Sequence, residues 1–366
     1  MRHSLDRTFL ILTGVLVAVG FLVFSSASLG LLSRGGADFS SVVPNQVIFG
    51  IIGGGIACFA ATTIHYRMWR QFAFYIFCIG MILTCLTFIP QFALAHGGAS
   101  RWLDFGFITF QPSELLKIAF VIYMATWLSG VKKHITSFTK GTLPFIGLAM
   151  VPAIPLLAQP DTDTYLIMAA AAVAMFIVAG GRVRDVVILA ICGLIVLILM
   201  AYTHEHVKSR IMVFLDPSDE QGAGYQIKQS LIAVGSGGFL GRGFGQSIQK
   251  FEYLPEPIGD SVFAVFAEEF GFAGSCALIM LFAAFLLRGL RVASHAPDLF
   301  SMLIVVGIIV LIALQVLLNI GSMIRIAPLA GLPLPFVSHG GTALLTLLAS
   351  IGIILNVSKY QKPVAG

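Results

Sequence analysis

The stretch YQIKQSLIAVGSGGFLGRGFGQSIQKFEYLPEPIGDSVFAVFAEEFG, residues Tyr225–Gly271, is a polar, glycine-rich interruption in a chain that is otherwise strongly apolar. Near its end stands a carboxylate, Asp260, where the next hydrophobic run begins. A long polar segment between membrane spans is costly to maintain, which indicates that it has a function. A carboxylate at the edge of a bilayer favours chemistry on a molecule that is itself anchored in that bilayer.

The composition on both sides of this stretch is that of a membrane protein. Hydrophobic residues make up 58% of the chain and charged residues 11%, whereas soluble domains average about 25% charged residues. The apolar runs approach the roughly 20 residues that a helix needs to cross a bilayer. We therefore predict an all-α integral membrane protein that forms a single domain, residues 1–366. The ten predicted spans are 8–30, 44–64, 71–89, 112–129, 143–158, 164–180, 185–203, 260–287, 299–322 and 340–358. The runs 143–158 and 164–180 could instead form one broken helical hairpin.

The distribution of lysine and arginine predicts the orientation. Short cytoplasmic loops carry the excess of these residues, and one set of loops holds thirteen of the 22, while the short loops opposite hold only Arg34, Arg101 and Arg325. Both termini are therefore expected in the cytoplasm, and the long loop 204–259, between the seventh and eighth spans, outside. The net charge of +5 is thus a topology signal and does not indicate nucleic-acid binding. The thirteen are Arg2, Arg7, Arg67, Arg70, Lys132, Lys133, Lys140, Arg182, Arg184, Arg288, Arg291, Lys359 and Lys362.

Charged residues also occur within the predicted spans. Glu114 and Lys117 are three residues apart and share a helical face, where each can neutralise the other. They form either a structural ion pair or a polar hinge or regulatory contact with another helix. Glu268 and Glu269 point in different directions, because successive helical positions differ by about 100°. Glu268 is expected in a structural pair, on a proton path or in a layer that supports Asp260.

Two further acids, Asp161 and Asp163, lie in the predicted outer turn AQPDTDTYL. Aspartate suits turns and helix N-caps. The alternative is an anionic site that helps to hold a divalent cation, Mg²⁺ or Mn²⁺, against a pyrophosphate.

The long outer loop combines helical patterns with a glycine cluster. VKSRIMVFL predicts an interfacial helix, and YQIKQSLIAVGSGG predicts a second one that the glycines terminate. Five glycines between Gly237 and Gly245 would let backbone N–H groups approach a phosphate closely, with Arg242 and Lys250 adding positive charge; the same glycines are also typical of turns. Asp260 suits a helix cap, and the helix dipole would favour an ionised carboxylate that can accept a proton.

These motifs together resemble those of the SEDS family (shape, elongation, division and sporulation). The resemblance covers nearly the whole chain in order. The matching pieces are SAS from Ser26, RW from Arg101, QPSELLK from Gln111, QPD from Gln159, RIMVFLDP from Arg210, GYQIKQSLIAVGSGGFLGRGFG from Gly224, YLPEP from Tyr253, FAVFAEEFG from Phe263 and PLPFVSHGGT from Pro333.

The resemblance implies a peptidoglycan glycosyltransferase that polymerises lipid II, and within the family GFGQSIQKFEYLPEP is more similar to the division type. The family's catalytic carboxylate maps to Asp260. Three motifs depart from the family's pattern. Ile258 and Gly259 replace a histidine and a threonine, Asp163 replaces a glycine in QPDLGT, and the family's SYGG reads SHGG at Ser338–Gly341.

The expected reaction joins a glycan on undecaprenyl pyrophosphate to a lipid II acceptor with inversion, and Asp260 acts as general base. Cationic groups would stabilise the leaving pyrophosphate. The substrate-binding residues are predicted to be Arg210, Arg242, Lys250, Glu256, Gly238 and Gly241.

The resemblance also implies a partner, a class B penicillin-binding protein that crosslinks the product, and a place in the bacterial cytoplasmic membrane with the active site facing outside. Two other function classes remain open. A lipid II flippase would use the charges buried in the spans, and a non-catalytic scaffold would only recruit the transpeptidase. Substitution of Asp260 discriminates among the three, because only the enzyme requires it for polymerisation.

Overall fold

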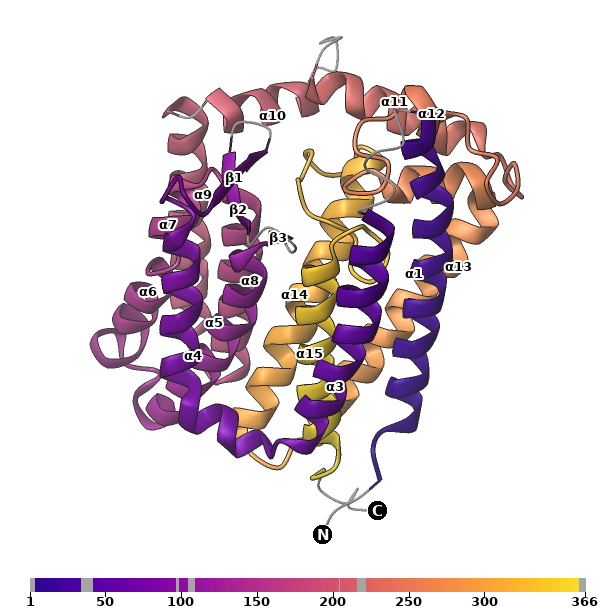
Figure 1. Ribbon diagram of the computed structural model, residues 1–366. Helices are drawn as coiled ribbons and strands as arrows, with labels where there is room; N and C mark the ends of the chain where they lie inside the picture. The colour runs from indigo at the N-terminus through magenta and orange to yellow at the C-terminus, as the bar shows by residue number, and fades with distance from the viewer. Residues whose placement is uncertain are drawn as a thin grey trace.

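The computed structural model describes residues 4–33, 42–96, 99–104, 109–203, 205–215 and 222–361. Long helices run side by side through most of the molecule, and shorter helices cross one end of the bundle (Figure 1). Within the described residues, nine segments are long and apolar enough to span a membrane. The nine are Arg7–Leu32, Val42–Thr63, Tyr66–Leu86, Pro112–His134, Phe138–Ala158, Val183–Met200, Val262–Ser294, Leu299–Met323 and Gly341–Ser358.

A shorter apolar helix, α8 (Thr162–Val178), accounts for the sixth predicted span. The fifth span is broken into η3 (Phe138–Thr142), α6 (Leu143–Met150) and α7 (Ala153–Ala158). The prolines in LPFIGLAMVPAIP explain the breaks, because proline cannot continue the hydrogen-bond ladder of the preceding turn.

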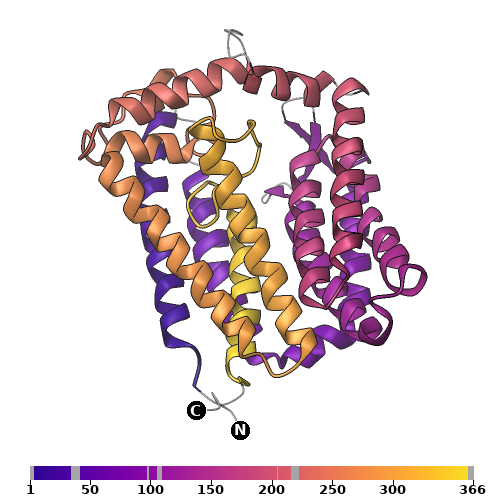
Figure 2. The ribbon, with the colours of Figure 1, turned by 180° about the vertical axis from the view of Figure 1, so that it is seen from behind.

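The helices form two groups that are bridged at one end (Figures 1 and 2). One group contains α1 (Arg7–Ser33), η1 (Gln46–Gly53), α3 (Gly54–Thr63), α13 (Val262–Ser294), α14 (Leu299–Met323) and α15 (Gly341–Ser358). The other contains α4 (Tyr66–Leu86), α5 (Pro112–Val131), η2 (Lys132–His134), α6 to α8, and α9 (Val183–Thr203). The groups meet where α14 packs against α5 and α8.

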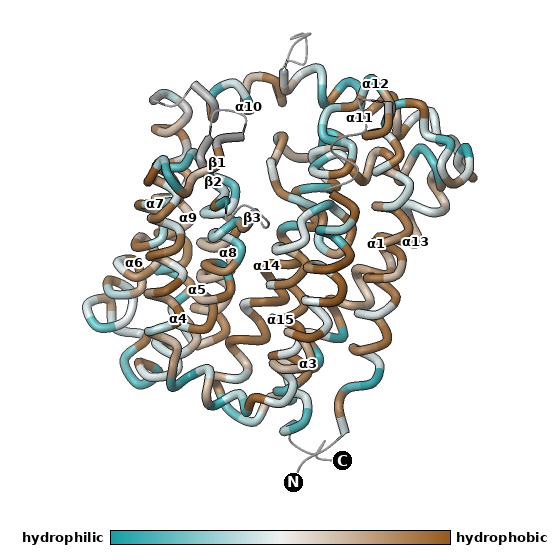
Figure 3. Tube along the Cα trace, in the orientation of Figure 1, coloured by the Kyte–Doolittle hydropathy of each residue, from teal (hydrophilic) through white to brown (hydrophobic). Residues whose placement is uncertain are grey.

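Hydrophobic residues dominate the long helices and polar residues gather at their ends (Figure 3). In α15, 72% of the residues are buried inside the protein, against 6% of residues Val183–Met200 of α9. α9 therefore presents its apolar side chains to the outside, as expected of a helix surrounded by lipid, whereas α14 and α15 form the protein core.

The long polar loop is largely helical. α10 (Glu205–Leu215) and α11 (Ala223–Ser236) cross the end of the bundle, and α12 (Gln249–Glu252) is a single short turn. Both helices expected in this loop are thus confirmed. The ends of α1 and α15 lie at the opposite pole, where Asp6 N donates to Ser358 Oγ at 3.1 Å.

A small antiparallel sheet, which the sequence pattern did not predict, lies between α4 and α5. It pairs β1 (Ala93–His96) with β2 (Ala99–Asp104), and β2 with β3 (Thr109–Phe110). The register sets Ala93 opposite Leu103 and Leu103 opposite Phe110. β2 carries Arg101 and Trp102, which line a cavity between the two helix groups.

α13 is interrupted at Gly271, which has φ 67° and ψ −166°. The glycine-rich loop 237–245 fills the break and pairs with the backbone groups that it frees. Gly241 allows the close approach, because a Cβ there would lie 2.2 Å from Glu269 O. The four hydrogen bonds are Arg242 N to Glu268 O (3.0 Å), Gly243 N to Glu269 O (2.9 Å), Phe272 N to Gly238 O (2.9 Å) and Ala273 N to Phe239 O (3.0 Å).

Candidate functional site

A cavity of about 400 Å³ lies between the two helix groups. Both groups contribute to its wall. One side comes from β2, β3, α5 and α8, and the other from the segment before α13 and the segment before α15. Its ionisable lining residues are Arg101, Glu114, Glu256, Asp260 and His339.

Asp260 sits in a tight turn immediately before α13. Gly259 N and Ser261 N both donate to Glu256 O, at 3.1 and 3.2 Å. Asn319 in α14 donates to Asp260 O and to Leu332 O, each at 2.8 Å. The carboxylate is therefore held on a backbone that is tied to two other elements, as a reacting group requires.

Glu256 has a left-handed backbone conformation, with φ 46°. This region is uncommon for residues other than glycine, and such strain concentrates at functional sites. The conformation sets Glu256 in the same cavity wall as Asp260, so that two carboxylates face one space.

The surroundings raise the pKa of Asp260 to about 7. Burial is the largest cause, and the negative charges of Glu256 and Asp163 add to it, while Arg210 and Arg101 act in the opposite direction. A carboxyl group with this pKa exists in both protonation states near neutral pH, which suits it to proton transfer.

Asp163 and Arg210 form an ion pair beside Asp260. Asp163 Oδ2 accepts from Arg210 Nη1 and from Gly331 N, the latter at 2.9 Å. A Cβ added to Gly331 would lie 3.4 Å from Arg210 Nη2 and 3.6 Å from both Asp163 Oδ2 and Asp260 Oδ2. α8, α10 and the turn before α13 therefore bring these three side chains around Gly331.

The two aspartates predicted to help hold a cation have different surroundings. Asp161 is buried, its Oδ2 has no hydrogen-bond partner within the described part of the chain, and burial raises its pKa. Asp163 is engaged by Arg210 and Gly331. No cluster of three or more histidine, cysteine, aspartate or glutamate side chains that could hold a metal ion occurs in the part of the chain that the structure describes.

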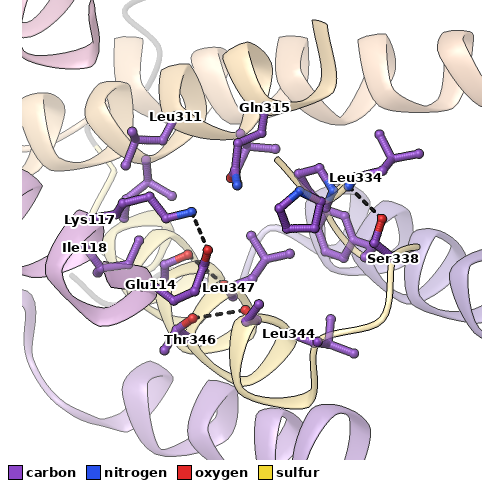
Figure 4. Close-up of a pocket in the computed structure, with 18 of the residues that line it drawn as sticks. Glu114, Lys117, Ile118, Leu311, Gln315, Leu334, Ser338, Leu344, Thr346 and Leu347 are labelled. Atoms are coloured by element: carbon purple, nitrogen blue, oxygen red, sulfur yellow. Dashed lines mark hydrogen bonds and ion pairs between the residues drawn. The ribbon is translucent and has the colours of Figure 1, made fainter. Parts of the chain in front are cut away.

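Glu114 and Lys117 form a buried ion pair, with Nζ and Oε1 2.8 Å apart, as their spacing of three residues predicts. Both line a second, smaller pocket of about 40 Å³ deeper in the bundle (Figure 4). Gln315 from α14 and Ser338 also line this pocket in the close-up. Glu114 belongs to the walls of both cavities, which therefore adjoin.

Lys250 does not reach the main cavity. Its side chain is fully buried, with Nζ 2.7 Å from Glu269 Oε1, 3.0 Å from Ser26 Oγ and 2.9 Å from Gly245 O. The expected contact with a leaving pyrophosphate is not supported by this position, because the ammonium group is already neutralised and enclosed between α1 and α13.

The glycine cluster and Arg242 likewise contact α13. Gly238 and Gly241 take part in the joint at the break of that helix, which supports the turn alternative over a phosphate site. Glu268 accepts from Ser247 Oγ and Ile248 N at 2.6 and 3.1 Å, and Arg242 Nε lies 3.4 Å from it. Glu268 thus anchors the loop that leads to Asp260.

Sequence reasoning assigned no role to Asn319 or His339. Asn319 interrupts the apolar run of α14 and is fully buried, and a polar residue within a span is itself a functional signal. In the sequence, His339 differs from the family's pattern, because SHGG replaces SYGG. Its position in the cavity wall depends on the path of residues 324–340, which no hydrophobic periodicity predicts.

Comparison with known proteins places this geometry in context. A family model described as "Cell cycle protein", for FtsW, RodA and SpoVE, matches residues 6–363. The stage V sporulation protein E of Bacillus subtilis is 38% identical over 362 residues, which cover 99% of each chain. A probable peptidoglycan glycosyltransferase FtsW of Geobacter sulfurreducens is 35% identical over 98% of this chain and 96% of its own.

Solved structures show the same fold. A chain from a structure titled as a peptidoglycan synthase complex that coordinates polymerization and crosslinking superposes with a TM-score of 0.82 at 25% identity, covering 98% of this chain and 99% of its own. The rod shape determining protein RodA of Thermus thermophilus superposes with a TM-score of 0.71 at 25% identity and covers 98% of each chain.

Proposed function

The chain belongs to the family of FtsW, RodA and SpoVE, and from this premise we propose that it is a peptidoglycan glycosyltransferase that polymerises lipid II. The proposal is carried by one observation. Asp260, with a pKa of about 7, lies in a cavity of about 400 Å³ between two groups of membrane helices.

In the proposed reaction, the 4-hydroxyl oxygen of the acceptor's N-acetylglucosamine bonds to the anomeric carbon of the donor's N-acetylmuramic acid. The bond from that carbon to the undecaprenyl pyrophosphate oxygen breaks, its electron pair leaves with the pyrophosphate, and the centre inverts. Asp260 takes the hydroxyl proton as the new bond forms. General base catalysis of this kind typically contributes about 10²–10⁴-fold.

The leaving pyrophosphate needs positive charge, which we assign to Arg101 and Arg210. Arg101 lines the cavity, and Arg210 is held beside Asp260 by Asp163. The described side chains do not fit a site for Mg²⁺ or Mn²⁺ at Asp161 and Asp163, because Arg210 already neutralises Asp163 and no third acidic or histidine ligand joins them.

The proposed location is the bacterial cytoplasmic membrane, with the cavity facing outside. Arg288, near the end of α13, pairs with Asp6, just before α1, at 2.8 Å. These helix ends adjoin the loops with the excess of basic residues that cytoplasmic loops hold. A class B penicillin-binding protein is the proposed partner, and the similarity to a chain of a peptidoglycan synthase complex supports it.

The test is glycan polymerisation from purified lipid II by the wild type and by Asp260→Asn, each reconstituted with a transpeptidase partner. We expect polymer from the wild type and a loss of at least about 10²-fold in the variant, since the base is removed while the shape is kept. Equal polymer from both would move the catalytic role elsewhere. Polymer from neither would favour a flippase or a scaffold.

A further inference from the structure

His339 lines the main cavity but has no part in the chemistry described above. It lies in the segment before α15 and also borders the deeper pocket and a third, small pocket of about 20 Å³. Its Nε2 is fully buried and has no hydrogen-bond partner among the residues that the structure describes. Because buried polar atoms are almost always paired, an unpartnered one on a residue that lines a cavity calls for a partner that the surrounding side chains do not supply.

The segment that carries His339 is tied directly to the turn that carries Asp260. His339 N donates to Ile258 O at 2.7 Å, and Ser338 Oγ donates to Gly259 O at 2.7 Å. The imidazole ring stacks on Phe24, with centroids 5.9 Å apart and planes at 21°. These contacts hold the ring in a fixed position relative to the general base, as substrate positioning requires.

The charge state of the ring limits the ligand. Burial lowers the pKa of His339 to about 4, so the ring is neutral at physiological pH and its Nε2 either donates or accepts a single hydrogen bond. A pyrophosphate is better matched by the guanidinium groups of Arg101 and Arg210. The uncharged hydroxyl and acetamido groups of a sugar match a neutral imidazole.

We propose that His339 Nε2 hydrogen-bonds an uncharged hydroxyl or acetamido group of the bound sugar and so positions that sugar against Asp260. The inference rests on the proposed glycosyltransferase function, and it adds the residue that recognises the sugar rather than the pyrophosphate. It requires that loss of Nε2 weakens binding of the sugar-bearing lipid and leaves binding of the lipid pyrophosphate unchanged.

The test measures binding of two probes, lipid II and undecaprenyl pyrophosphate, to the full-length protein in the Asp260→Asn background, where no turnover occurs. Three variants are compared. His339→Phe keeps the stack on Phe24 without the nitrogen, His339→Gln places an amide nitrogen near the position of Nε2, and His339→Asn is too short to reach it.

We expect His339→Phe and His339→Asn to weaken lipid II binding by about 3–10-fold, the effect of one neutral hydrogen bond, and His339→Gln to retain most of it. Binding of undecaprenyl pyrophosphate stays within about twofold in all three, since the guanidinium groups that bind it are untouched. Thermal unfolding identifies any variant that does not fold. His295→Phe, at the opposite end of α13, serves as the matched control.

Two results would overturn the inference: unchanged lipid II binding by the folded Phe or Asn variant, or equal weakening of both probes, which indicates a structural role. Polymerisation by the otherwise wild-type protein is measured separately. If the His339 variants bind lipid II more weakly but the wild-type protein makes no polymer, the glycosyltransferase function is refuted and the sugar contact stands. If the wild-type protein makes polymer but the variants bind lipid II normally, the sugar contact is refuted and the glycosyltransferase function stands.

Discussion

Two carboxylates in one cavity make the catalytic residue sensitive to its neighbour. Asp260 must be ionised to accept a proton, so activity is expected to rise with pH through about 7, the pKa of this group. Glu256 contributes to that raised pKa through its negative charge. Glu256→Gln removes the charge and keeps the size, which lowers the pKa of Asp260 and moves the rise in activity to lower pH.

The measurement is the pH profile of kcat/KM for lipid II polymerisation from about pH 5.5 to 8.5, since this parameter reports ionisations of the free enzyme. Glu252→Gln removes a charge from an exposed position of α12, outside the cavity wall, and should leave the midpoint in place. A midpoint that stays fixed or rises in Glu256→Gln would contradict the electrostatic account.

For single residues, the sequence located Asp260 better than it located the surroundings of the cations. Asp260 is a carboxylate at the start of a hydrophobic run, and its catalytic role is a prediction from the resemblance to the family. Lys250 lies in the same loop and has the same apparent suitability for phosphate, yet its side chain turns inward to Glu269. The direction of a lysine side chain depends on which helix packs beside it, and linear spacing carries no such information.

An ion pair connects α10 to α8 close to Asp260. Arg210 in α10 bonds to Asp163 at the start of α8, and both are largely shielded from solvent. Asp163→Asn removes the charge that holds Arg210, so α10 should open more often and the leaving-group cation should lose its position. We expect faster amide hydrogen exchange across residues 207–215 and a fall in kcat/KM of about tenfold, as a lost charge-assisted contact produces.

Lys228→Gln is the matched control, because it removes a charge from an exposed position of α11. Exchange in α13 should be the same in both variants. If amide hydrogen exchange in α10 is unchanged in Asp163→Asn, other contacts of α10 hold this helix in place.

The loop that leads to Asp260 is fastened to α1 and α13 by the buried contacts of Lys250. Lys250→Met leaves Glu269 without its cation, and breaking a buried ion pair typically costs about 3–5 kcal/mol. We expect a marked fall in thermal stability in detergent, whereas Arg242→Met, which removes a half-exposed partner of Glu268, should cost about 1 kcal/mol or less.

The double variant Lys250→Met with Glu269→Met isolates the pair. It should be more stable than Lys250→Met alone, because no unpaired charge remains buried. A double variant that is destabilised by the full sum of the two single changes would contradict the pairing.

Element by element, periodicity located the long helices well and the connecting segments poorly. The two helices of the outer loop were predictable from their amphipathic spacing and glycine stops. The packing of loop 237–245 into the break of α13 at Gly271 was not predictable, because it depends on hydrogen bonds between the backbones of two segments. The sheet of β1, β2 and β3 also escaped prediction, because its strands are only two to six residues long.

For the whole molecule, apolar length and the placement of lysine and arginine were sufficient to predict a multi-span helical fold. These two patterns could not predict the cavity, because its wall combines segments far apart in the sequence. The segments are β2 near residue 101, the turn before α13 near residue 260 and the segment before α15 near residue 339. Such a site exists only after two groups of helices have packed, and a linear pattern does not specify how they pack.

The orientation of the whole molecule gives the last prediction. If the cavity faces outside, α11 must lie on that side and the end of α13 must lie in the cytoplasm. Lys228→Cys and Ser294→Cys place a thiol at each pole, at exposed positions. A membrane-impermeant maleimide applied to intact cells should label Lys228→Cys and should reach Ser294→Cys only after the cells are opened. The native cysteines lie in α3, α4, α9 and α13, so labelling of the wild type sets the background. The reverse labelling pattern would place the cavity in the cytoplasm, where a donor carried outward on a lipid could not be used, and would refute the glycosyltransferase together with the orientation.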